Sequence, residues 1–282
     1  MTSNDGEKLG ENGAQFEHDA ARPLAPGVGF TAQRTGWRDG LIVLGFLALI
    51  AAGLFASLRP LTGFLVNRIP VAVDASLGEK LGALQRASGH AIEDARTAQV
   101  RELVQRDVLP YLGAVSDSSD APLGLPRITV LDDAAVNAFA LPGGEIFVLR
   151  GLLDAPAMND DALVGVLAHE VAHALRRHAM RGLVRQHLLQ LAAATLVGGL
   201  DAGTVTLVGG GLTLGDLAYD RSMEAEADEV AGLVLLAGHR PTEPLAKFLE
   251  EIDTMAAVPA LVLNHPPGHE RAARLRAMSA SH

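Results

Sequence analysis

The pentapeptide His-Glu-Val-Ala-His at residues 169–173 constrains the fold of this chain more than any other sequence feature. Positions i and i+4 of an α-helix lie on the same face, so a helix here would allow His169 and His173 to bind one metal ion. The preceding run LVGVLA (163–168) is apolar and indicates that this helix is buried. Burial would keep both imidazoles rigid. The pattern therefore predicts a domain built around a buried, metal-binding helix.

Glu170 lies between the histidines in sequence but is offset around the helix. A carboxylate at this place can reach a water molecule at an open coordination position of zinc. Zinc lowers the pKa of such a water, and the carboxylate can take its proton as the water attacks a peptide carbonyl. The motif therefore favours a zinc metallopeptidase with Glu170 as the general base. The alternative is a helix that carries two incidental histidines.

A catalytic zinc ion usually takes three protein ligands, so a third ligand has to be found. The histidine of an extended HExxHxxGxxH pattern is missing, because residues 174–179 read ALRRHA. His178 follows His173 by five positions. On a continuous helix it would lie off the metal-binding face, and we expect it to be exposed.

Residues 221–228, RSMEAEAD, offer a better candidate for the third ligand. Glu224 and Asp228 are four residues apart and would share one face of a helix, whereas Glu226 falls elsewhere. One of the two carboxylates can bind the metal while the other, one turn away, accepts a hydrogen bond from a ligand imidazole. An acidic cluster usually marks a solvated helix face, but the apolar run VAGLVLLAG follows this one directly.

Composition excludes several other classes of site. The net charge of -10 disfavours nucleic-acid binding, which needs clustered Lys and Arg side chains. The chain has no cysteine, so disulfides, thiolate metal sites and a cysteine nucleophile are excluded. Hydrophobic residues make up 49% of the chain and aromatic residues only 4%, which predicts a core of mainly Leu, Val and Ala.

The N-terminal part divides into two segments of different character. Residues 1–40 are rich in Gly, Asn, Asp, Glu and Pro and predict a disordered tail. Residues 41–58 contain no charge and are flanked by Arg38 and Arg59, so we expect a transmembrane helix that contacts the lipid bilayer. The alternative is a buried core helix. The positive-inside rule slightly favours a cytoplasmic N-terminus, which would put a bacterial catalytic domain in the periplasm.

The remaining residues predict mainly helices with a few strands. Alternation predicts strands at 127–133 and 144–153, and Asn159 or Asp160 would cap the helix that contains the histidines and runs to about Arg181. Further helices are expected at about 77–112, 183–197 and 217–237, after Pro241 and after Pro267. The apolar segment 188–219 has only two charged residues, Asp201 and Asp216, and we expect a packed or mobile hairpin there. The alternatives are a membrane-dipping hairpin or a lid over the site.

Four motifs in order resemble the HtpX and CAAX-prenyl-protease group of zinc metallopeptidases, which includes BepA-like members. They are NAFALPGGEIFVLRGLL, HEVAH, RSMEAEAD and NHPPGHER, and the resemblance covers about residues 70–278.

The resemblance implies a gluzincin arrangement of the site. His169, His173 and Glu224 would be the ligands of one zinc ion per chain, with Glu170 as the base and Asp228 steadying one histidine. The strand around 137–141 would form the edge of a cleft, where an extended substrate can pair through its backbone.

His265 lies in a His-Pro sequence that matches a loop of the BepA-like members. In that loop a histidine can approach the zinc, either closing its fourth position or steadying the oxyanion. The alternative is a loop histidine without metal contact. His269 and Arg271 would be helix-cap and carboxylate partners.

The combined expectation is an α+β, mostly α-helical protein. A zincin-like metallopeptidase domain at 70–282 would carry a small β-sheet beside the HExxH helix. It would hydrolyse peptide bonds in misfolded or misassembled membrane or envelope proteins, in a bacterial inner membrane. The alternative function is a membrane-tethered binding or chaperone-like module with a structural or blocked zinc site, because a structural site has no open position.

Overall fold

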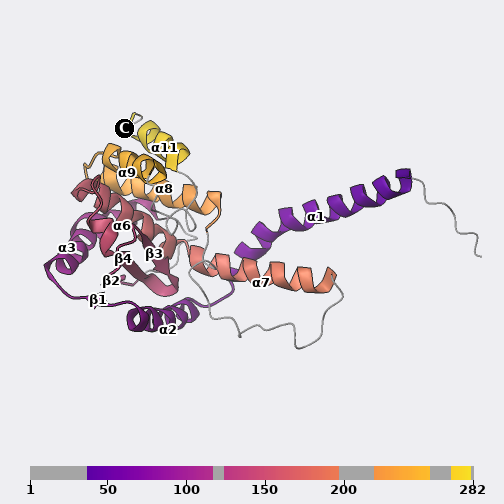
Figure 1. Ribbon diagram of the computed structural model, residues 1–282, viewed down its shortest axis with the longest axis horizontal. Coiled ribbons are helices and arrows are strands. Elements are labelled where there is room, and N and C mark those ends of the chain that lie inside the picture. Colours follow the sequence, from indigo (N-terminus) through magenta and orange to yellow (C-terminus); the bar gives the residue numbers. More distant parts are fainter. Residues whose placement is uncertain (1–36, 117–123, 197–218, 255–267, 281–282) are drawn as a thin grey trace, which may run out of the picture. The chain divides into compact units, whose positions relative to one another are not determined.

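The computed structural model describes residues 37–116, 124–196, 219–254 and 268–280 (Figure 1). The chain divides into two compact units, Met1–Ala51 and Ala52–His282. The described residues are mostly helical with one small sheet, which confirms the expected fold class. The residues of the predicted tail before position 37 lie outside the described part.

Helix α1 (Trp37–Val66) runs through the segment that was predicted to cross a membrane. Crossing the hydrocarbon core takes about 20 consecutive, mostly apolar residues. Among the residues that the structure describes, no helix is both long enough and apolar enough to do so. The predicted transmembrane helix at 41–58 is therefore not supported.

The helix expected at about 77–112 is divided into several elements. It comprises α2 (Val71–Ser88), the short strand β1 (Ala91–Ile92), α3 (Ala95–Leu103), the π-helical turn η1 (Val104–Val108) and α4 (Leu109–Val115). Gly89 has an extended backbone and ends α2. Asp94 then caps α3, because its side chain accepts hydrogen bonds from the backbone N–H groups of Arg96 and Thr97. The single predicted helix was wrong because these two capping signals were not used.

The sheet has four strands in the order β1-β2-β4-β3. Strand β2 (Arg127–Leu131) pairs parallel with β4 (Glu145–Leu149), and β3 (Ala138–Leu141) pairs antiparallel with β4. Pro142–Gly144 forms the 3-10 turn η2 between β3 and β4, and Gly143 has a φ of 73°. A Cβ atom there would lie 2.6 Å from the Cα atom of Ala75 on α2, so the turn requires glycine. This pairing leaves β3 as an edge of the described sheet.

In the part of the chain that the structure describes, six helices follow the sheet. They are α5 (Arg150–Leu153), α6 (Asp160–Leu175), α7 (His178–Leu196), α8 (Arg221–Ala237), α9 (Glu243–Thr254) and α11 (Gly268–Ala280). Asn159 caps α6 as predicted, its side chain accepting from the backbone N–H of Ala162 at 2.9 Å. Figure 1 shows α6 between the sheet and the group α8, α9 and α11. Every residue of α6 from Ala162 to Leu175 is buried, so its polar residues lie in the core.

Arg177 fixes the C-terminal end of α6 to the junction of α1 and α2. Its φ of 54° is uncommon for a residue other than glycine and turns the chain sharply between α6 and α7. The guanidinium donates to both carboxylate oxygens of Asp74, at 2.6 and 2.8 Å, and to the backbone carbonyls of Val66 and Ile69. These bonds hold the backbone in its strained conformation, and α7 therefore leaves α6 in a new direction.

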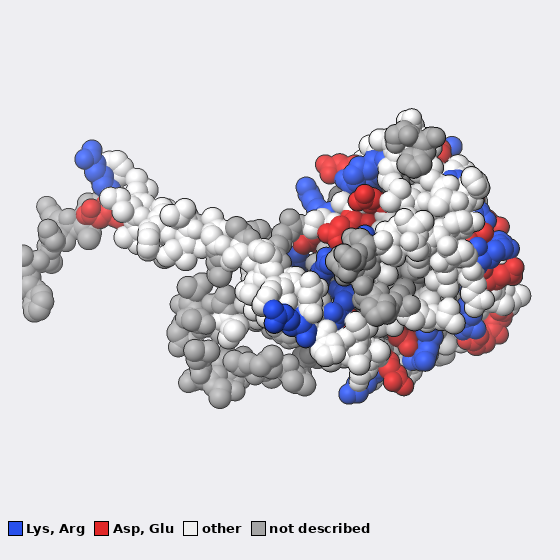
Figure 2. All heavy atoms as spheres, turned by 180° about the vertical axis from the view of Figure 1, so that it is seen from behind, with Lys and Arg blue, Asp and Glu red and all other residues white. Residues whose placement is uncertain are grey.

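Charges of both signs are interspersed over the surface. Figure 2 shows Lys and Arg side chains alternating with Asp and Glu side chains on the visible face of the larger unit. Exposed side chains of opposite charge also form ion pairs, such as Arg101 with Glu93 at 2.7 Å. Interspersed charges of this kind produce no strong field of one sign on that face.

Candidate metal centre

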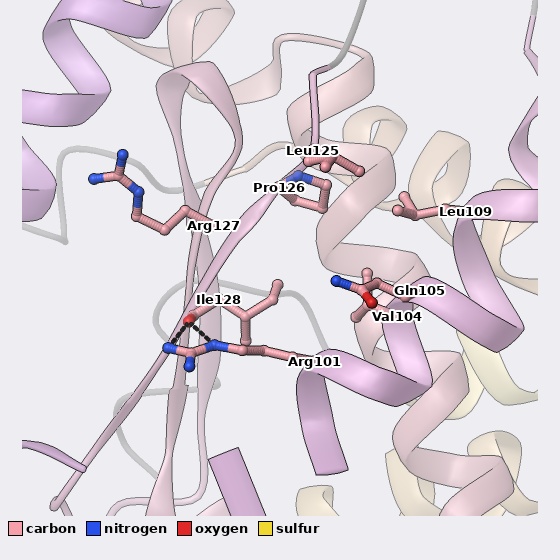
Figure 3. A pocket seen from close by; sticks show the side chains of 8 residues that line it. All are labelled: Arg101, Val104, Gln105, Leu109, Leu125, Pro126, Arg127 and Ile128. Atoms are coloured by element: carbon pink, nitrogen blue, oxygen red, sulfur yellow. Dashed lines mark hydrogen bonds between the residues drawn. The ribbon is translucent and has the colours of Figure 1, made fainter. Parts of the chain in front are cut away.

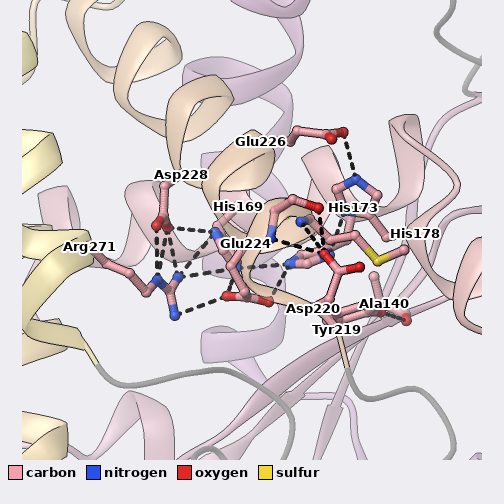
Figure 4. A network of polar contacts seen from close by, with 12 residues as sticks. Ala140, His169, His173, His178, Tyr219, Asp220, Glu224, Glu226, Asp228 and Arg271 are labelled. Atoms are coloured by element: carbon pink, nitrogen blue, oxygen red, sulfur yellow. Dashed lines mark hydrogen bonds and ion pairs between the residues drawn. The ribbon is translucent and has the colours of Figure 1, made fainter. Parts of the chain in front are cut away.

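His169 and His173 lie one turn apart on α6 and point their Nε2 atoms toward each other, 2.9 Å apart. Glu224, on the first turn of α8, faces them: its carboxylate oxygens lie 3.5 Å from Nε2 of His169 and 3.4 Å from Nε2 of His173. All three side chains are buried, and their ligand atoms lie within 4.8 Å of one another. The structure thus brings together the three residues that sequence reasoning selected (Figure 4).

This donor set fits a zinc ion. Two imidazole nitrogens and one carboxylate oxygen are the protein ligands of a common type of catalytic zinc site, in which the fourth position is left to water or substrate. Imidazole also suits several other transition metals, so the donor set indicates a metal site of this class. The close approach of three polar groups inside a core is itself expensive unless they bind a common partner.

Glu170 is buried beside His169 and borders a small cavity of about 30 Å³. His169 and Arg271 also reach this cavity, and its other walls are apolar side chains from the sheet, α5, α6 and α9: Ala138, Leu152, Val166, Leu245, Phe248, Leu249 and Ile252. The carboxylate of Glu170 is therefore next to the candidate metal ligands and in a region from which bulk water is largely excluded.

Asp228 lies behind His169, one turn after Glu224 on α8. Its Oδ1 is 3.2 Å from Nδ1 of His169, which is the contact expected for the second carboxylate of the acidic cluster. Burial alone would raise the pKa of Asp228. The charge of Arg271 and the hydrogen bonds from His169 and Arg271 outweigh burial and hold that pKa well below its usual range. Asp228 is thus ionised and can orient the imidazole.

Arg271, on α11, is the cation that compensates the buried carboxylates. Its guanidinium donates to Asp228 at distances of 2.7 to 3.1 Å and lies 3.1 Å from Glu224. Its Nη2 also approaches the ring of His169 at 3.3 Å. The motif NHPPGHER gave the signal for a carboxylate partner, but its contact with Glu224 could not be derived from spacing.

His178 was expected to be exposed, and this prediction was wrong. The side chain is fully buried, with Nδ1 2.9 Å from Nδ1 of His173 and Nε2 3.2 Å from Glu226. The expectation assumed one helix up to Arg181. The helix ends at Leu175, and the turn at Arg177 swings His178 back toward the ligands.

Tyr219 is a residue of the site that sequence reasoning missed. Its ring stacks on the ring of His173 with centroids 3.9 Å apart, and its hydroxyl donates to the backbone carbonyl of Ala140 on the edge strand β3. Burial, together with the charges of Glu170 and Glu224, raises its pKa well above the ordinary value. The neutral Tyr219 side chain therefore links the residues just before α8 to His173 and to strand β3.

Two predictions fall outside the described residues. His265 belongs to the range 255–267, and most of the apolar segment 188–219 belongs to the range 197–218. Of that segment, Leu188–Leu196 are part of α7 and Tyr219 is buried against His173.

Another cavity, of about 210 Å³, lies between η1 and the start of β2 (Figure 3). There the guanidinium of Arg101 donates two hydrogen bonds to the backbone carbonyl of Ile128, at 3.1 and 3.0 Å. Ile128 lies outside the part of β2 that pairs with β1, which is Val130 and Leu131. The rest of the lining is Val104, Gln105, Leu109, Leu125, Pro126 and Arg127. None of the residues that line it belongs to the metal centre, so this cavity is separate from the candidate site.

Metal affinity is expected to rise with pH, because a proton competes for His169. Burial and the charge of Arg271 lower the pKa of His169, but the hydrogen bonds to Asp228 and Glu224 and the charge of Glu224 raise it to about 9 overall. Protonated imidazole cannot bind a metal ion, so the apparent zinc affinity should increase roughly tenfold per pH unit below that value. Competition titrations with a chelator of known affinity between pH 7 and 9 measure this slope, and a flat profile would contradict it.

Comparison with known proteins agrees with the geometry. Residues 94–279, more than half of the chain, match the model of peptidase family M48. The chain is 33% identical over 172 residues to the mitochondrial metalloendopeptidase OMA1 of Schizosaccharomyces pombe, covering 58% of this chain and 49% of the relative. It is 29% identical over 163 residues to the beta-barrel assembly-enhancing protease of Escherichia coli, covering 52% and 33%. The chain therefore spans about half or less of the length of these relatives.

Proposed function

The chain belongs to peptidase family M48, and from this premise we propose that it is a zinc-dependent endopeptidase. Of the two relatives named above, one is called a metalloendopeptidase and the other a protease. The observation that carries the proposal is the convergence of His169, His173 and Glu224 within 4.8 Å, with Glu170 buried beside them. A helix with two incidental histidines would not place a third metal-binding group from another helix at the same point.

In this proposal each site residue has a separate task. His169, His173 and Glu224 hold the zinc ion, which when bound would polarise the peptide carbonyl and lower the pKa of a water molecule. Glu170 takes a proton from the attacking water and gives it to the leaving amine. Asp228 orients His169, and Arg271 compensates the charges of Glu224 and Asp228.

The substrate is proposed to be an extended polypeptide that pairs with β3. The strand is an edge of the described sheet, and an extended peptide can add to such an edge through main-chain hydrogen bonds. The carbonyl of Ala140 already accepts from the hydroxyl of Tyr219. A backbone carbonyl can accept two hydrogen bonds, so a substrate N–H could pair there beside the Tyr219 hydroxyl. We expect loosely folded chains to be preferred, because they can present an extended segment to the strand.

The natural substrates are proposed to be misfolded or misassembled proteins of a membrane or cell envelope. The names of the two relatives support this, since one is mitochondrial and the other enhances beta-barrel assembly. We also propose that residues 70–282 form the catalytic domain, a range that encloses the family match at 94–279.

Metal removal tests the proposal. The purified full chain should cleave an unfolded protein such as reduced casein, lose this activity to background after dialysis against 1,10-phenanthroline, and regain it on addition of zinc. The activity depends on the metal because three of the site's four central side chains serve to bind it. Cleavage that persists without metal would contradict the proposal. Zinc binding without any cleavage would instead favour a binding module with a structural or blocked metal site.

A further inference from the structure

His178 is a buried imidazole that the proposed reaction does not use. It lies directly behind His173, at the start of α7, with the two ring centroids 4.9 Å apart and the rings nearly perpendicular. Its Nδ1 approaches Nδ1 of His173 at 2.9 Å, and its Nε2 approaches Oε2 of Glu226 at 3.2 Å. Figure 4 shows these residues as a row that leads from the metal centre to Glu226.

The positions of the protons along this row follow from metal binding. His173 faces His169 and Glu224 with Nε2, so it would bind the metal through Nε2 and carry its proton on Nδ1. That N–H group points at Nδ1 of His178, which must then accept with its lone pair. The proton of His178 is therefore on Nε2, where it is donated to the carboxylate of Glu226. One tautomer of each ring satisfies the whole row.

The other candidate ligand, His169, also has an acidic residue behind its ring, but without an intervening histidine. Nδ1 of His169 contacts Oδ1 of Asp228 directly, at 3.2 Å. Glu226 lies two residues from Glu224 and Asp228 and so points to a different side of α8. It is His178 that bridges the remaining distance to His173. All three acidic residues of the cluster thus serve the centre, one at the metal position and one behind each imidazole.

The outer end of the row reaches the surface. Glu226 has a side-chain exposure of 39%, and Arg181 holds its Oε2 at 3.3 Å. Glu226 and Arg181 border a cavity of about 360 Å³, whose lining does not include Glu170. The inner members, His173 and His178, are fully buried. Substitutions at Glu226 can therefore alter the row from its solvent end without opening the core.

We propose that His178 and Glu226 are positioning residues that fix the tautomer and orientation of His173 and thereby strengthen metal binding. The inference rests on the proposed function, because it requires His173 to be a metal ligand. Outer partners of this kind contribute about 10- to 100-fold to metal affinity in other proteins. In this proposal both residues act through His173 and not on the substrate itself.

The test compares two replacements of His178 in the full chain. Phenylalanine keeps a ring of similar size but offers no acceptor, whereas the amide oxygen of asparagine can take the place of Nδ1. Zinc dissociation constants from chelator competition should rise about 10- to 100-fold for His178→Phe and stay within about threefold of the wild type for His178→Asn. If both variants bind zinc as the wild type does, or if asparagine is as harmful as phenylalanine, the inference is wrong.

A second pair of variants leaves the core intact. Glu226→Met removes the outer acceptor and should weaken zinc binding, while Glu229→Met, at an exposed position of the same helix, should not. Imidazole N–H signals of the zinc-loaded chain give a readout that packing alone would not change. The Nδ1–H proton of His173 should be hydrogen-bonded and slow to exchange in the wild type and His178→Asn, and should lose this protection in His178→Phe; an unchanged Nδ1–H signal in His178→Phe would overturn the inference.

These measurements distinguish the further inference from the proposed function, because they record zinc binding and not catalysis. A wild-type chain that binds no zinc would refute the proposed function together with the inference. A wild-type chain that binds zinc, and loses it on Glu224→Ala but not on His178→Phe or Glu226→Met, would refute the inference alone.

Discussion

A Glu170→Gln variant is expected to retain its zinc ion and to cleave peptides about 10²- to 10⁴-fold more slowly than the wild type. Glutamine has nearly the same shape as glutamate, so it should fit the same buried place beside His169. It cannot accept a proton from the attacking water. The ratio kcat/KM for a fluorogenic peptide and the metal content of the same sample are the two quantities to measure.

A glutamate-to-glutamine change at an exposed place provides the control. Glu229→Gln on α8 makes the same chemical change and should leave kcat/KM within about twofold of the wild type. Full activity of Glu170→Gln would exclude the general-base role. Loss of zinc together with activity would instead indicate that Glu170 maintains the metal site.

Replacing Arg271 by methionine should strongly destabilise the metal-free protein. Arg271 is buried and lies 2.7 Å from Asp228 and 3.1 Å from Glu224. Methionine fills similar space but leaves two buried carboxylates without their main cation. Removing one partner of a buried ion pair typically costs about 3–5 kcal/mol, which we expect as the decrease in the free energy of unfolding measured in urea.

Arg274 offers a matched control, because it contacts the same carboxylate. Its guanidinium lies 3.3 Å from Oδ2 of Asp228, but its side chain is 44% exposed. Arg274→Met should therefore lower the free energy of unfolding by less than about 1 kcal/mol. Equal losses for the two variants would show that burial does not govern this network, and a small loss for Arg271→Met would show that its charge is not needed there.

The helix faces that carry the candidate metal ligands were predictable because they depend on periodicity. Four-residue spacing places His169 and His173 on one helix face, and the same rule pairs Glu224 with Asp228. The cap at Asn159 was equally local, since it needs only a side-chain oxygen before a helical pattern. That α6 and α8 place their side chains at one site was predicted from the resemblance to a known family, because residue spacing within one helix does not tell which helices pack together.

The residues around the candidate metal ligands were less predictable because they depend on where helices end. The burial of His178 follows from the turn at Arg177, whose positive φ is stabilised by Asp74, more than a hundred positions earlier in the chain. Tyr219 lies before α8 and contacts His173 only through tertiary packing. Helical periodicity carries no information on either contact.

Metal content of the zinc-loaded, dialysed full chain, compared with that of a Glu224→Ala variant, tests the central claim most directly. The account predicts about one zinc ion per wild-type chain and a small fraction of that in the variant, because Glu224 is one of the three protein ligands proposed among the described residues. A wild-type chain without zinc, or a Glu224→Ala chain that keeps a full equivalent, would contradict it.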